Sequence, residues 1–475
     1  MPAALLESGF LGRNGWTISR HFFSIISGNI REIKNLTNEG GQVMRTGKLD
    51  PGLRILQNAE MDGKVVLLRV DHNVVKAGEI KDPYRIDATF PTLYAIAARG
   101  GRPILITHVG RPKDKKSGEI VCRQGEAVDA IAKYLEQKLA VRIHVPEFPI
   151  DPERGILHLD RERVAPAVED LKHGRFDMIY LPNSRWFAGE QAKGKERESF
   201  AQEMASIADL YVNDAFGSWR PHASTFDIAA KLPSFAGILL QREISNLHRA
   251  LEPEKPFVAV VAGAKYDTKI GPIKALYDKV DHLILGGLIY NTFLAAKYGA
   301  RIAGVADEDI ALARELVEMD SGQGRIVEMP FLVEVDTMDE KGREGARKVS
   351  MADMVKGGTF GYIVDVHPDS LMHSETVQVI DSAMTVFVNA VMGYMPLYPE
   401  GTRALYELIG RNKRSQKLFA GGDTLQELRS LCPGVYLSGL NDPDTYYFTG
   451  GGTVLTAIEM GGAYRLEPVS ALMGR

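Results

Sequence analysis

The chain has little cysteine, with only Cys122 and Cys432 among 475 residues. Two distant cysteines without histidines at metal-ligand spacing argue against a disulfide framework and against a structural zinc site. They are typical of a protein of the reducing cytoplasm, where we expect this chain. The net charge of -4 gives no indication of a nucleic-acid partner. No apolar run is long enough to span a bilayer, so we expect no membrane partner.

The composition is that of an ordinary globular protein, with 45% hydrophobic and 25% charged residues. A length of 475 residues predicts two domains. The first 43 residues differ from the rest, because they show no clear period. They carry Glu7 and Glu32, whereas transit peptides are usually poor in acidic residues. We expect a loosely ordered extension here, or an upstream start codon with Met44 as the true first residue.

From residue 64 onward, short apolar runs alternate with helix-like stretches. This pattern predicts βαβ units and parallel sheets, and it restarts after a long predicted helix. We therefore expect an α/β protein with two doubly wound, Rossmann-like domains. The runs of the first half are "VVLLRV", "RPILITHV", "DMIYLPN" and "DLYVNDAFG". Those of the second half are "FVAVVAGAK", "HLILGG", "GYIVDV", "TVFVNAVMG", "KLFAGGDT" and "YYFTGGG". The expected boundaries are 44–235 for the first domain, 236–250 for the joining helix and 251–448 for the second domain.

Polar groups follow the strands of the first half. In open parallel sheets, ligands bind beyond the carboxyl ends of the strands, so these groups are candidate ligand contacts. Arginine side chains suit carboxylates and phosphates, and the pattern therefore predicts a small, multiply charged anion. The candidates are Asp71, Asn73, His108, Arg111, Arg185 and Arg220, with Arg85 opening the first helix.

The strands of the second half end in glycine-rich loops instead. Glycine lets backbone amides approach phosphate oxygens, and a following helix N-terminus adds positive potential. Lys265 and Lys269 are four residues apart, so on a helix they share a face. Asp423 and Thr424 are candidate contacts for a magnesium ion and a phosphate. One half that grips a small anion and another that grips a phosphate chain suit phosphoryl transfer.

At these residues the chain resembles the phosphoglycerate kinase family. The family's "RVDFN" appears as "RVDHN" (69–73), "SHLGRP" as "THVGRP" (107–112) and "LRF" as "SRW" (184–186). "NDAFGTAHRAH" appears as "NDAFGSWRPH" (213–222), one residue shorter before the arginine. "GGAKVxDK" appears as "AGAKYDTK" (262–269), "GGGDT" as "AGGDT" (420–424) and "STGGGA" as "FTGGGT" (448–453). The resemblance implies two Rossmann-like lobes, with the C-terminal segment, residues 449–475, packing back on the first.

The resemblance also implies roles for particular residues. Arg85 and Lys265 would stabilise the phosphoryl group in flight, with Gly422 and Gly451 on the transfer path. The 3-phosphoglycerate site would comprise Asp71, Asn73, Arg85, His108, Arg111, Arg185 and Arg220. The nucleotide site would comprise Gly263, Lys265, Lys269, Asn389, Gly421, Gly422, Asp423 and Thr424, with Asp423 holding Mg²⁺. His72 replaces the family's phenylalanine, and we expect it to lie behind the substrate contacts.

The departures from the family fall on the base and ribose side. "NGPxGxFE", whose glutamate holds the ribose, becomes "NAVMGYMP", with Pro396 at the glutamate position; Glu400 lies nearby in sequence. "GGGMAF" becomes "GGLIYN" and "GLDCGP" becomes "IVDVHP". Leu288, Tyr290, Ile363 and His367 then stand where small residues belong. We expect this bulk to narrow the adenine slot, unless a shifted backbone keeps it open.

Taken together, the resemblance implies a glycolytic phosphotransferase with a carboxyl group as acceptor. It would move a phosphoryl group between 1,3-bisphosphoglycerate and ADP, with Mg²⁺ and ATP/ADP, and act as a monomer on small molecules. One alternative keeps this chemistry but uses another nucleotide or pyrophosphate. Another is a non-catalytic protein that binds 3-phosphoglycerate. Retention of Lys265, Lys269, Asp423 and Thr424 argues against this last alternative.

A chain shortened to begin at Met44 should fold and keep the activity of the full chain. The reason is the absence of a hydrophobic period before that residue. Thermal melts of the two proteins test this, and they should agree within a few degrees, since removing 1 kcal/mol of packing shifts a melting temperature by roughly 2–4 °C in a domain of this size. A large drop on shortening would show that the segment packs on the core.

Overall fold

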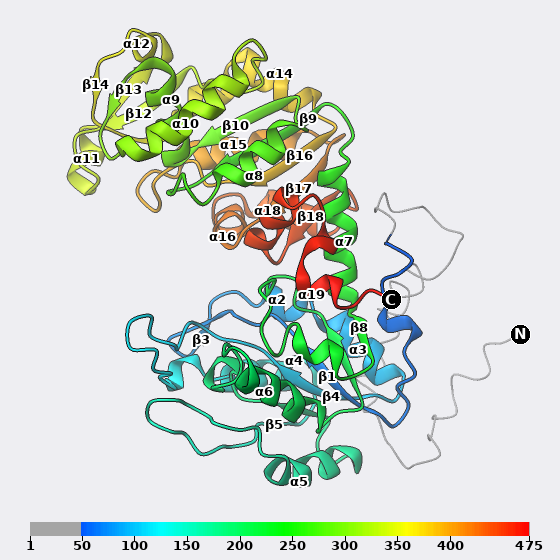
Figure 1. Cartoon of the computed structure of the whole chain (residues 1–475). Helices are drawn as coiled ribbons and strands as arrows, with labels where there is room; N and C mark the ends of the chain where they lie inside the picture. The colour runs from blue at the N-terminus through cyan, green and yellow to red at the C-terminus, as the bar shows by residue number, and fades with distance from the viewer. Residues whose placement is uncertain (1–48, 475) are drawn as a thin grey trace, which may run out of the picture. The chain divides into compact units, whose positions relative to one another are not determined.

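The computed structural model describes residues 49–474, and the N-terminal extension expected over residues 1–43 lies outside them. The chain divides into two compact units. Unit 1 comprises Asp50–Gln241 and the segment from Glu467 onward, and unit 2 comprises Arg242–Leu466. The chain passes from one to the other within α7, which spans Ile238–Leu251 (Figure 1). The sequence had suggested that the last segment begins at residue 449, whereas the grouping with unit 1 begins at Glu467.

Unit 1 is built on a six-stranded sheet in the order β5-β6-β4-β1-β7-β8. Every pair in it is parallel. The strands are β1 (Val65–Arg69), β4 (Arg102–Ile106), β5 (Ile143–His144), β6 (Met178–Tyr180), β7 (Leu210–Asn213) and β8 (Ser234–Ala236). All five residues of β1 are buried, as expected for a central strand covered on both faces. A small antiparallel ribbon joins β2 (Val75–Lys76) and β3 (Glu79–Ile80).

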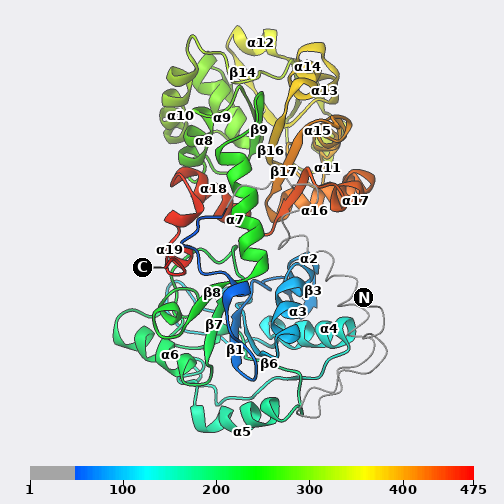
Figure 2. The same ribbon diagram turned by 90° about the vertical axis from the view of Figure 1, so that its right-hand side faces the viewer.

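Helices cover both faces of this sheet, with α3 and α4 on one side and α6 on the other (Figure 2). In α4, Ile131, Leu135 and Leu139 are buried at a spacing of four residues, which is the helical period of an apolar face. The helices are α2 (Tyr84–Asp87), α3 (Phe90–Ala98), α4 (Asp129–Leu139), α5 (Arg161–Lys172), α6 (Lys195–Ala205) and α19 (Glu467–Ser470).

Unit 2 is built on a five-stranded parallel sheet in the order β10-β9-β16-β17-β18. Its strands are β9 (Phe257–Ala262), β10 (His282–Gly286), β16 (Thr385–Asn389), β17 (Gln416–Ala420) and β18 (Thr445–Phe448). A three-stranded antiparallel sheet contains β12 (Phe331–Val335), β13 (Arg347–Ser350) and β15 (Tyr362–Val366). A two-stranded sheet pairs β11 (Arg301–Ile302) with β14 (Thr359–Phe360).

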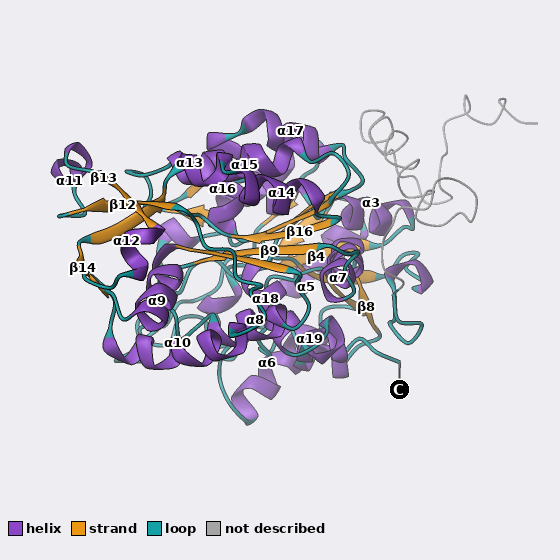
Figure 3. Cartoon of the chain, turned by 90° about the horizontal axis from the view of Figure 1, so that it is seen from above, coloured by secondary structure: helices purple, strands orange, loops and turns teal. Residues whose placement is uncertain are grey.

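In Figure 3 the main sheet of unit 2 has α13, α14, α15, α16 and α17 on one face and α8, α9, α10 and α18 on the other. The helices of the first group are α13 (Pro368–Met372), α14 (Ser374–Ser382), α15 (Glu400–Arg411), α16 (Gly422–Leu431) and α17 (Pro433–Leu440). Those of the second are α8 (Ile270–Tyr277), α9 (Gly287–Tyr298), α10 (Asp307–Asp320) and α18 (Gly451–Glu459). The short helices α11 (Glu340–Glu344) and α12 (Met351–Val355) accompany the antiparallel sheet.

The prediction of an α/β fold with two parallel-sheet lobes is confirmed, while three details differ. The first helix, which Arg85 was expected to open, is the short α2, and a separate helix, α3, follows it, because Pro91 lies in the first turn of α3 and has no backbone N–H. The long helix begins only at Ile238, after β8. The run "GYIVDV" forms β15, which pairs antiparallel with β12 instead of entering the main sheet.

This architecture brings the loops after the parallel strands together at one edge of each sheet, where a ligand can reach them. Within residues 49–474, no helix is long and apolar enough to cross a membrane.

Candidate active site

A cavity of about 720 Å³ lies in unit 1, among the loops that follow its strands. Six of the seven residues predicted to bind the anion line it: Asn73, Arg85, His108, Arg111, Arg185 and Arg220. The seventh, Asp71, is buried and is not part of the lining. The sequence prediction missed the cationic residues Arg69, Lys113 and Lys115, which also line the cavity. Arg69 is the last residue of β1, two positions before Asp71, so its place at the strand's carboxyl end was the signal for it.

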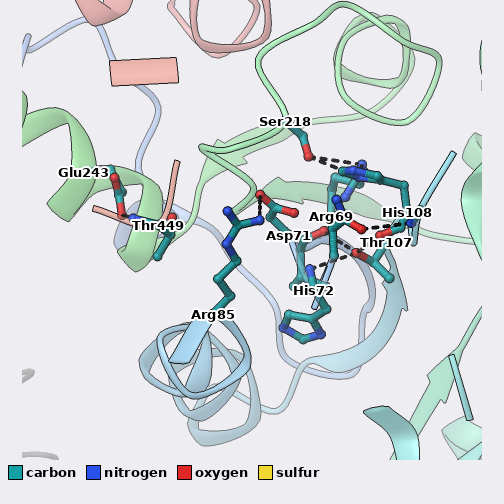
Figure 4. A network of polar contacts seen from close by, with 12 residues as sticks. Arg69, Asp71, His72, Arg85, Thr107, His108, Ser218, Glu243 and Thr449 are labelled. Carbon is teal, nitrogen blue, oxygen red and sulfur yellow. Dashed lines mark hydrogen bonds and ion pairs between the residues drawn. The ribbon is translucent and has the colours of Figure 1, made fainter. Parts of the chain in front are cut away.

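Arg69 is the most enclosed of the cavity's cations, with 1% of its surface exposed. Its guanidinium donates to the Ser224 hydroxyl at 2.9 Å and to the Val70 carbonyl. It also donates to Nδ1 of His108 at 3.1 Å (Figure 4). Ser224 in turn donates to the buried carboxylate of Glu190 at 2.6 Å. Arg69 is thus fixed by a chain of hydrogen bonds that ends on a negative charge, so it is held before any ligand arrives.

His108 is not an additional cation of this site. Burial lowers the pKa of His108 well below its usual value, and the charges of Arg185, Arg69 and Arg85 lower it further. Because Nδ1 accepts a hydrogen bond from Arg69, the ring's proton belongs on Nε2. His108 therefore acts as a neutral hydrogen-bond donor among arginines.

Arg185 is also held by the protein. Its NH1 donates to the Gly110 carbonyl at 2.5 Å, and the pKa of Arg185 is lowered to about 10, mainly by burial and then by the charge of Arg69. Its Nε is buried and has no hydrogen-bond partner among the described residues. A buried N–H without a partner is costly, and an anion in the cavity would satisfy it.

The predicted set also contains one carboxylate, Asp71, and one amide, Asn73, and both have partners within the protein. NH1 of Arg85 lies 3.4 Å from Oδ2 of Asp71, and its guanidinium points at that carboxylate in Figure 4. Oδ1 of Asn73 accepts from the backbone N–H of Gly110 at 2.9 Å, which ties the loop after β1 to the loop after β4. The arrangement presents arginines on a fixed frame and can bind a phosphate and a carboxylate together.

Unit 2 contains a second cavity, of about 620 Å³. All the residues predicted to bind the nucleotide line it: Gly263, Lys265, Lys269, Asn389, Gly421, Gly422, Asp423 and Thr424. The two lysines do not share a helical face, because α8 begins at Ile270 and Lys265 lies in the preceding turn. They reach the same cavity because the turn carries them there. The prediction that the two lysines share a helical face is therefore wrong, although both line the cavity.

Lys269 is held firmly within this cavity. Its Nζ donates to the Ala262 carbonyl at 2.5 Å and to Oδ1 of Asn389 at 2.7 Å. The Asn389 amide donates in turn to the Ala420 carbonyl at 2.6 Å. Burial lowers the pKa of Lys269 to about 8, against a weaker opposing effect of the Asp423 charge. With a pKa of about 8, Lys269 loses its charge only slightly above neutral pH when no anion is bound.

The N-terminus of α16 faces the same cavity. Its cap residue, Gly421, has a φ of 116° and makes no side-chain cap, so the amides of the first turn are left for a ligand. Asp423 in that turn is exposed. Mg²⁺ is commonly held by one or two carboxylates together with substrate phosphates, so a single exposed carboxylate beside this helix end fits a nucleotide-bound Mg²⁺. Among residues 49–474, no three His, Cys, Asp or Glu side chains gather to hold a metal by themselves.

Gly451 has a packing reason to be glycine. A Cβ at this position would lie 2.4 Å from the Cα of Gly421, and no side chain can approach a backbone so closely. Gly451 is not among the residues that line the 620 Å³ cavity. Its close contact with Gly421 shapes the loop before α16, while a role on the transfer path stays a prediction.

Only two of the four bulky side chains expected to narrow the adenine slot line this cavity. Leu288 and Ile363 line it, together with Tyr362 and Tyr394. Tyr290 is outside the lining: it is buried, and its hydroxyl accepts from the Met329 N–H at 2.8 Å. The expectation that Tyr290 narrows the slot is wrong, because α9 turns this side chain into the core.

His367, Glu400 and Pro396 are also absent from the lining. His367 caps α13, where its Nδ1 accepts from the Asp369 N–H at 3.2 Å, so it does not narrow the slot. Glu400 accepts from Arg343 at 2.7 Å. The charged residues of the lining are Lys265, Lys269 and Asp423, and all three were predicted to face the phosphates or Mg²⁺. The described lining therefore contains no further carboxylate for a ribose.

Comparison with known proteins identifies the family. The family model for phosphoglycerate kinase matches residues 56–461. The chain belongs to the phosphoglycerate kinase family. The phosphoglycerate kinase of Dictyoglomus turgidum is 34% identical over 412 residues, which cover 85% of this chain and 95% of that protein. That of Moorella thermoacetica is 34% identical over 410 residues, with the same coverage. The structure of phosphoglycerate kinase from Coxiella burnetii matches with a TM-score of 0.68 at 28% identity, covering 88% of this chain and 98% of the other.

Phosphoglycerate kinases use a nucleotide, and the state of Lys269 predicts how its binding depends on pH. A phosphate beside Nζ raises the pKa of Lys269 above 8, so at pH 8.5 binding of ADP should take up protons. Affinity should fall as the pH rises through 8, because the free protein loses this charge first. Calorimetric titration at pH 8.5 in two buffers of different ionisation enthalpy measures the uptake.

Lys269→Arg is the matched variant, since arginine keeps its charge throughout this range. It should bind ADP without proton uptake at pH 8.5. Equal enthalpies of the unchanged protein in both buffers would contradict the lowered pKa.

Proposed function

We propose that this chain is a phosphotransferase that moves a phosphoryl group between 1,3-bisphosphoglycerate and ADP, yielding 3-phosphoglycerate and ATP. Its family membership supports this reaction. The observation that carries the proposal is the unit 1 cavity, in which five arginines converge: Arg69, Arg85, Arg111, Arg185 and Arg220. Such a concentration of cations needs a multiply charged anion, and 3-phosphoglycerate carries both a phosphate and a carboxylate.

In the proposed mechanism, the two units hold the two reactants and most of the catalysis is positioning and charge stabilisation. Arg85 and Lys265 would neutralise the charge that develops on the phosphoryl oxygens. Lys269 and the first turn of α16 would bind nucleotide phosphates, with Gly422 supplying a backbone amide. Mg²⁺ held by the nucleotide and Asp423 would offset phosphate charge. We also propose that the protein acts in the cytoplasm and as a monomer.

Replacing Arg85 with alanine should lower kcat more than it lowers the affinity for 3-phosphoglycerate. Its charge is needed most in the transition state, and such losses appear in kcat. A hydrogen bond to a charged group is worth about 1.5–3 kcal/mol, so we expect roughly a ten- to hundredfold loss of kcat. Steady-state kinetics with 3-phosphoglycerate and Mg-ATP, coupled to a dehydrogenase, measure this directly.

Arg185→Ala and Arg220→Ala are the comparison variants, and they should mainly raise the KM for 3-phosphoglycerate. Equal activity of the unchanged protein and Arg85→Ala would show that Arg85 does not stabilise the transition state. No turnover by the unchanged protein, with intact binding of 3-phosphoglycerate, would favour a binding protein over an enzyme.

The nucleotide should bind mainly through its phosphates. The phosphate end of the cavity keeps its lysines, while the described lining offers no carboxylate to the ribose. Loss of one charged hydrogen bond corresponds to ~1.5–3 kcal/mol, which is ten- to a hundredfold in affinity. We therefore expect weak binding of Mg-ADP, poor discrimination between ADP and GDP, and effective competition by pyrophosphate or tripolyphosphate.

Calorimetric titrations with ADP, GDP and pyrophosphate test this expectation. Tight binding confined to adenine nucleotides would show that Leu288, Ile363 and the two tyrosines of the lining form a selective base pocket. Failure of all three to bind, beside intact binding of 3-phosphoglycerate, would support the non-catalytic alternative.

A further inference from the structure

His72 belongs to the motif RVDHN (69–73), but the proposed mechanism gives it no role. It follows Asp71 in the loop after β1, and its side chain is completely buried. In Figure 4 its ring and the Asp71 carboxylate point to opposite sides of the chain. His72 therefore cannot touch a ligand in the cavity, yet a buried polar ring in a core must be held by hydrogen bonds.

Both ring nitrogens of His72 have partners. Nδ1 lies 2.8 Å from the Tyr180 hydroxyl, at the end of β6. Nε2 lies 3.2 Å from Oγ1 of Thr89, between α2 and α3. The Thr89 hydroxyl gives its own proton to the Ile86 carbonyl, at the shorter distance of 2.7 Å. Thr89 can then only accept from His72, which places the ring proton on Nε2 and makes Nδ1 the acceptor of the Tyr180 proton.

The neutral ring satisfies every group in this chain of hydrogen bonds. Burial, and to a smaller extent the charge of Arg69, lowers the pKa of His72 to about 3. A second ring proton would face the Tyr180 hydroxyl, which already donates to that nitrogen. The ring is thus a fixed connector with one donor and one acceptor.

The connector reaches both members of the Asp71–Arg85 pair. It holds Asp71 through the backbone, because His72 is the next residue and its own N–H donates to Oγ1 of Thr107 at 2.9 Å. It holds Arg85 through Thr89 and the carbonyl of Ile86, the residue after Arg85. Arg85 sits on α2, a helix of only four residues that has no side-chain cap. Such a short helix does not hold its own orientation and depends on contacts outside it.

We propose that His72 is a positioning residue, which fixes α2 so that the Arg85 guanidinium meets the substrate in the geometry the reaction needs. The link from the imidazole through Thr89 to the turn of Arg85 carries this effect. The link to Tyr180 completes the hydrogen bonding of the ring and keeps it from rotating. This inference rests on the proposed function, because it assigns Arg85 to phosphoryl transfer.

The tautomer is the first test, and it does not depend on activity. In the full-length protein labelled with ¹⁵N-histidine, the His72 ring should show the Nε2–H tautomer, unchanged from pH 5.5 to 8. Comparison with the spectrum of His72→Phe assigns the signals. A ring of the opposite tautomer, or one that titrates in this range, would overturn the hydrogen-bonded link.

The second test separates positioning from stability. His72→Phe and Thr89→Val both break the link to Arg85, whereas Tyr180→Phe breaks only the other link. Small displacements of a catalytic group can cost up to about a hundredfold in rate, so we expect His72→Phe and Thr89→Val each to lower kcat by roughly ten- to a hundredfold, with the KM for 3-phosphoglycerate changed less than about threefold. The double variant should be no slower than His72→Phe alone. Tyr180→Phe should lower kcat less than either.

A matched control is Tyr277→Phe in unit 2, which removes a buried hydroxyl bonded to Asp320 at 2.9 Å. It should lower the melting temperature about as much as Tyr180→Phe and leave kcat unchanged. A kcat near that of the unchanged protein in both His72→Phe and Thr89→Val would overturn the proposal and leave these residues a purely structural role. No turnover by the unchanged protein would instead overturn the proposed function and the catalytic effect with it, while the Nε2–H tautomer would still support the link.

Discussion

The buried guanidinium of Arg69 sets the arrangement of the anion site in unit 1. A buried charge is tolerated only when its hydrogen bonds are complete, and Arg69 obtains them from Ser224, the Val70 carbonyl and His108. This demand keeps His108 neutral, since its Nδ1 must accept. It also gives a role to Glu190, whose carboxylate is fully buried and accepts from Ser224. The remaining arginines then line a cavity whose innermost charge is already compensated.

In unit 2 the positive potential of the cavity comes from fewer charged side chains and more from backbone amides. Lys269 is held by a carbonyl and by Asn389, and Asn389 is itself held by Ala420. The positive potential at the other side of the cavity comes from the uncapped first turn of α16, which requires no side chain. Gly421 is the single residue between β17 and α16, and it packs directly against Gly451, which leaves no room for a side chain at Gly451. The glycine-rich sequence here is a consequence of backbone packing as much as of ligand contact.

The sequence predicted well those features that depend on order along the chain. Alternating strands and helices led to the fold. Polar residues after strands, with Arg85 at the start of a helix, gave seven predicted anion contacts, and six of these line the unit 1 cavity. Side-chain direction was less predictable. Tyr290 and Leu288 are two residues apart, yet α9 turns one into the core and the other toward the cavity. Lys265 and Lys269 share a cavity through a turn and not through a helical face. Protonation was not predictable either, because the neutral state of His108 follows from a partner, Arg69, that is distant in sequence.

The positions at which this chain departs from the family's motifs have a physical explanation. The phosphate end of the unit 2 cavity depends on charge, on positive-φ glycine and on close backbone contact, and few substitutions can satisfy all of these at once. The base end depends on apolar surface and on space, for which many side chains are equivalent. Leu288 and Ile363 belong to the part of the lining predicted to face the base, and the lysines, Asp423 and Thr424 belong to the part predicted to face the phosphates. His72 follows the same logic in unit 1: it replaces an apolar ring by a polar one, and the core accommodates it because Tyr180 and Thr89 supply both hydrogen bonds. Substitution is therefore found where a local partner or an open space can absorb it, and not where a charge must meet a phosphate.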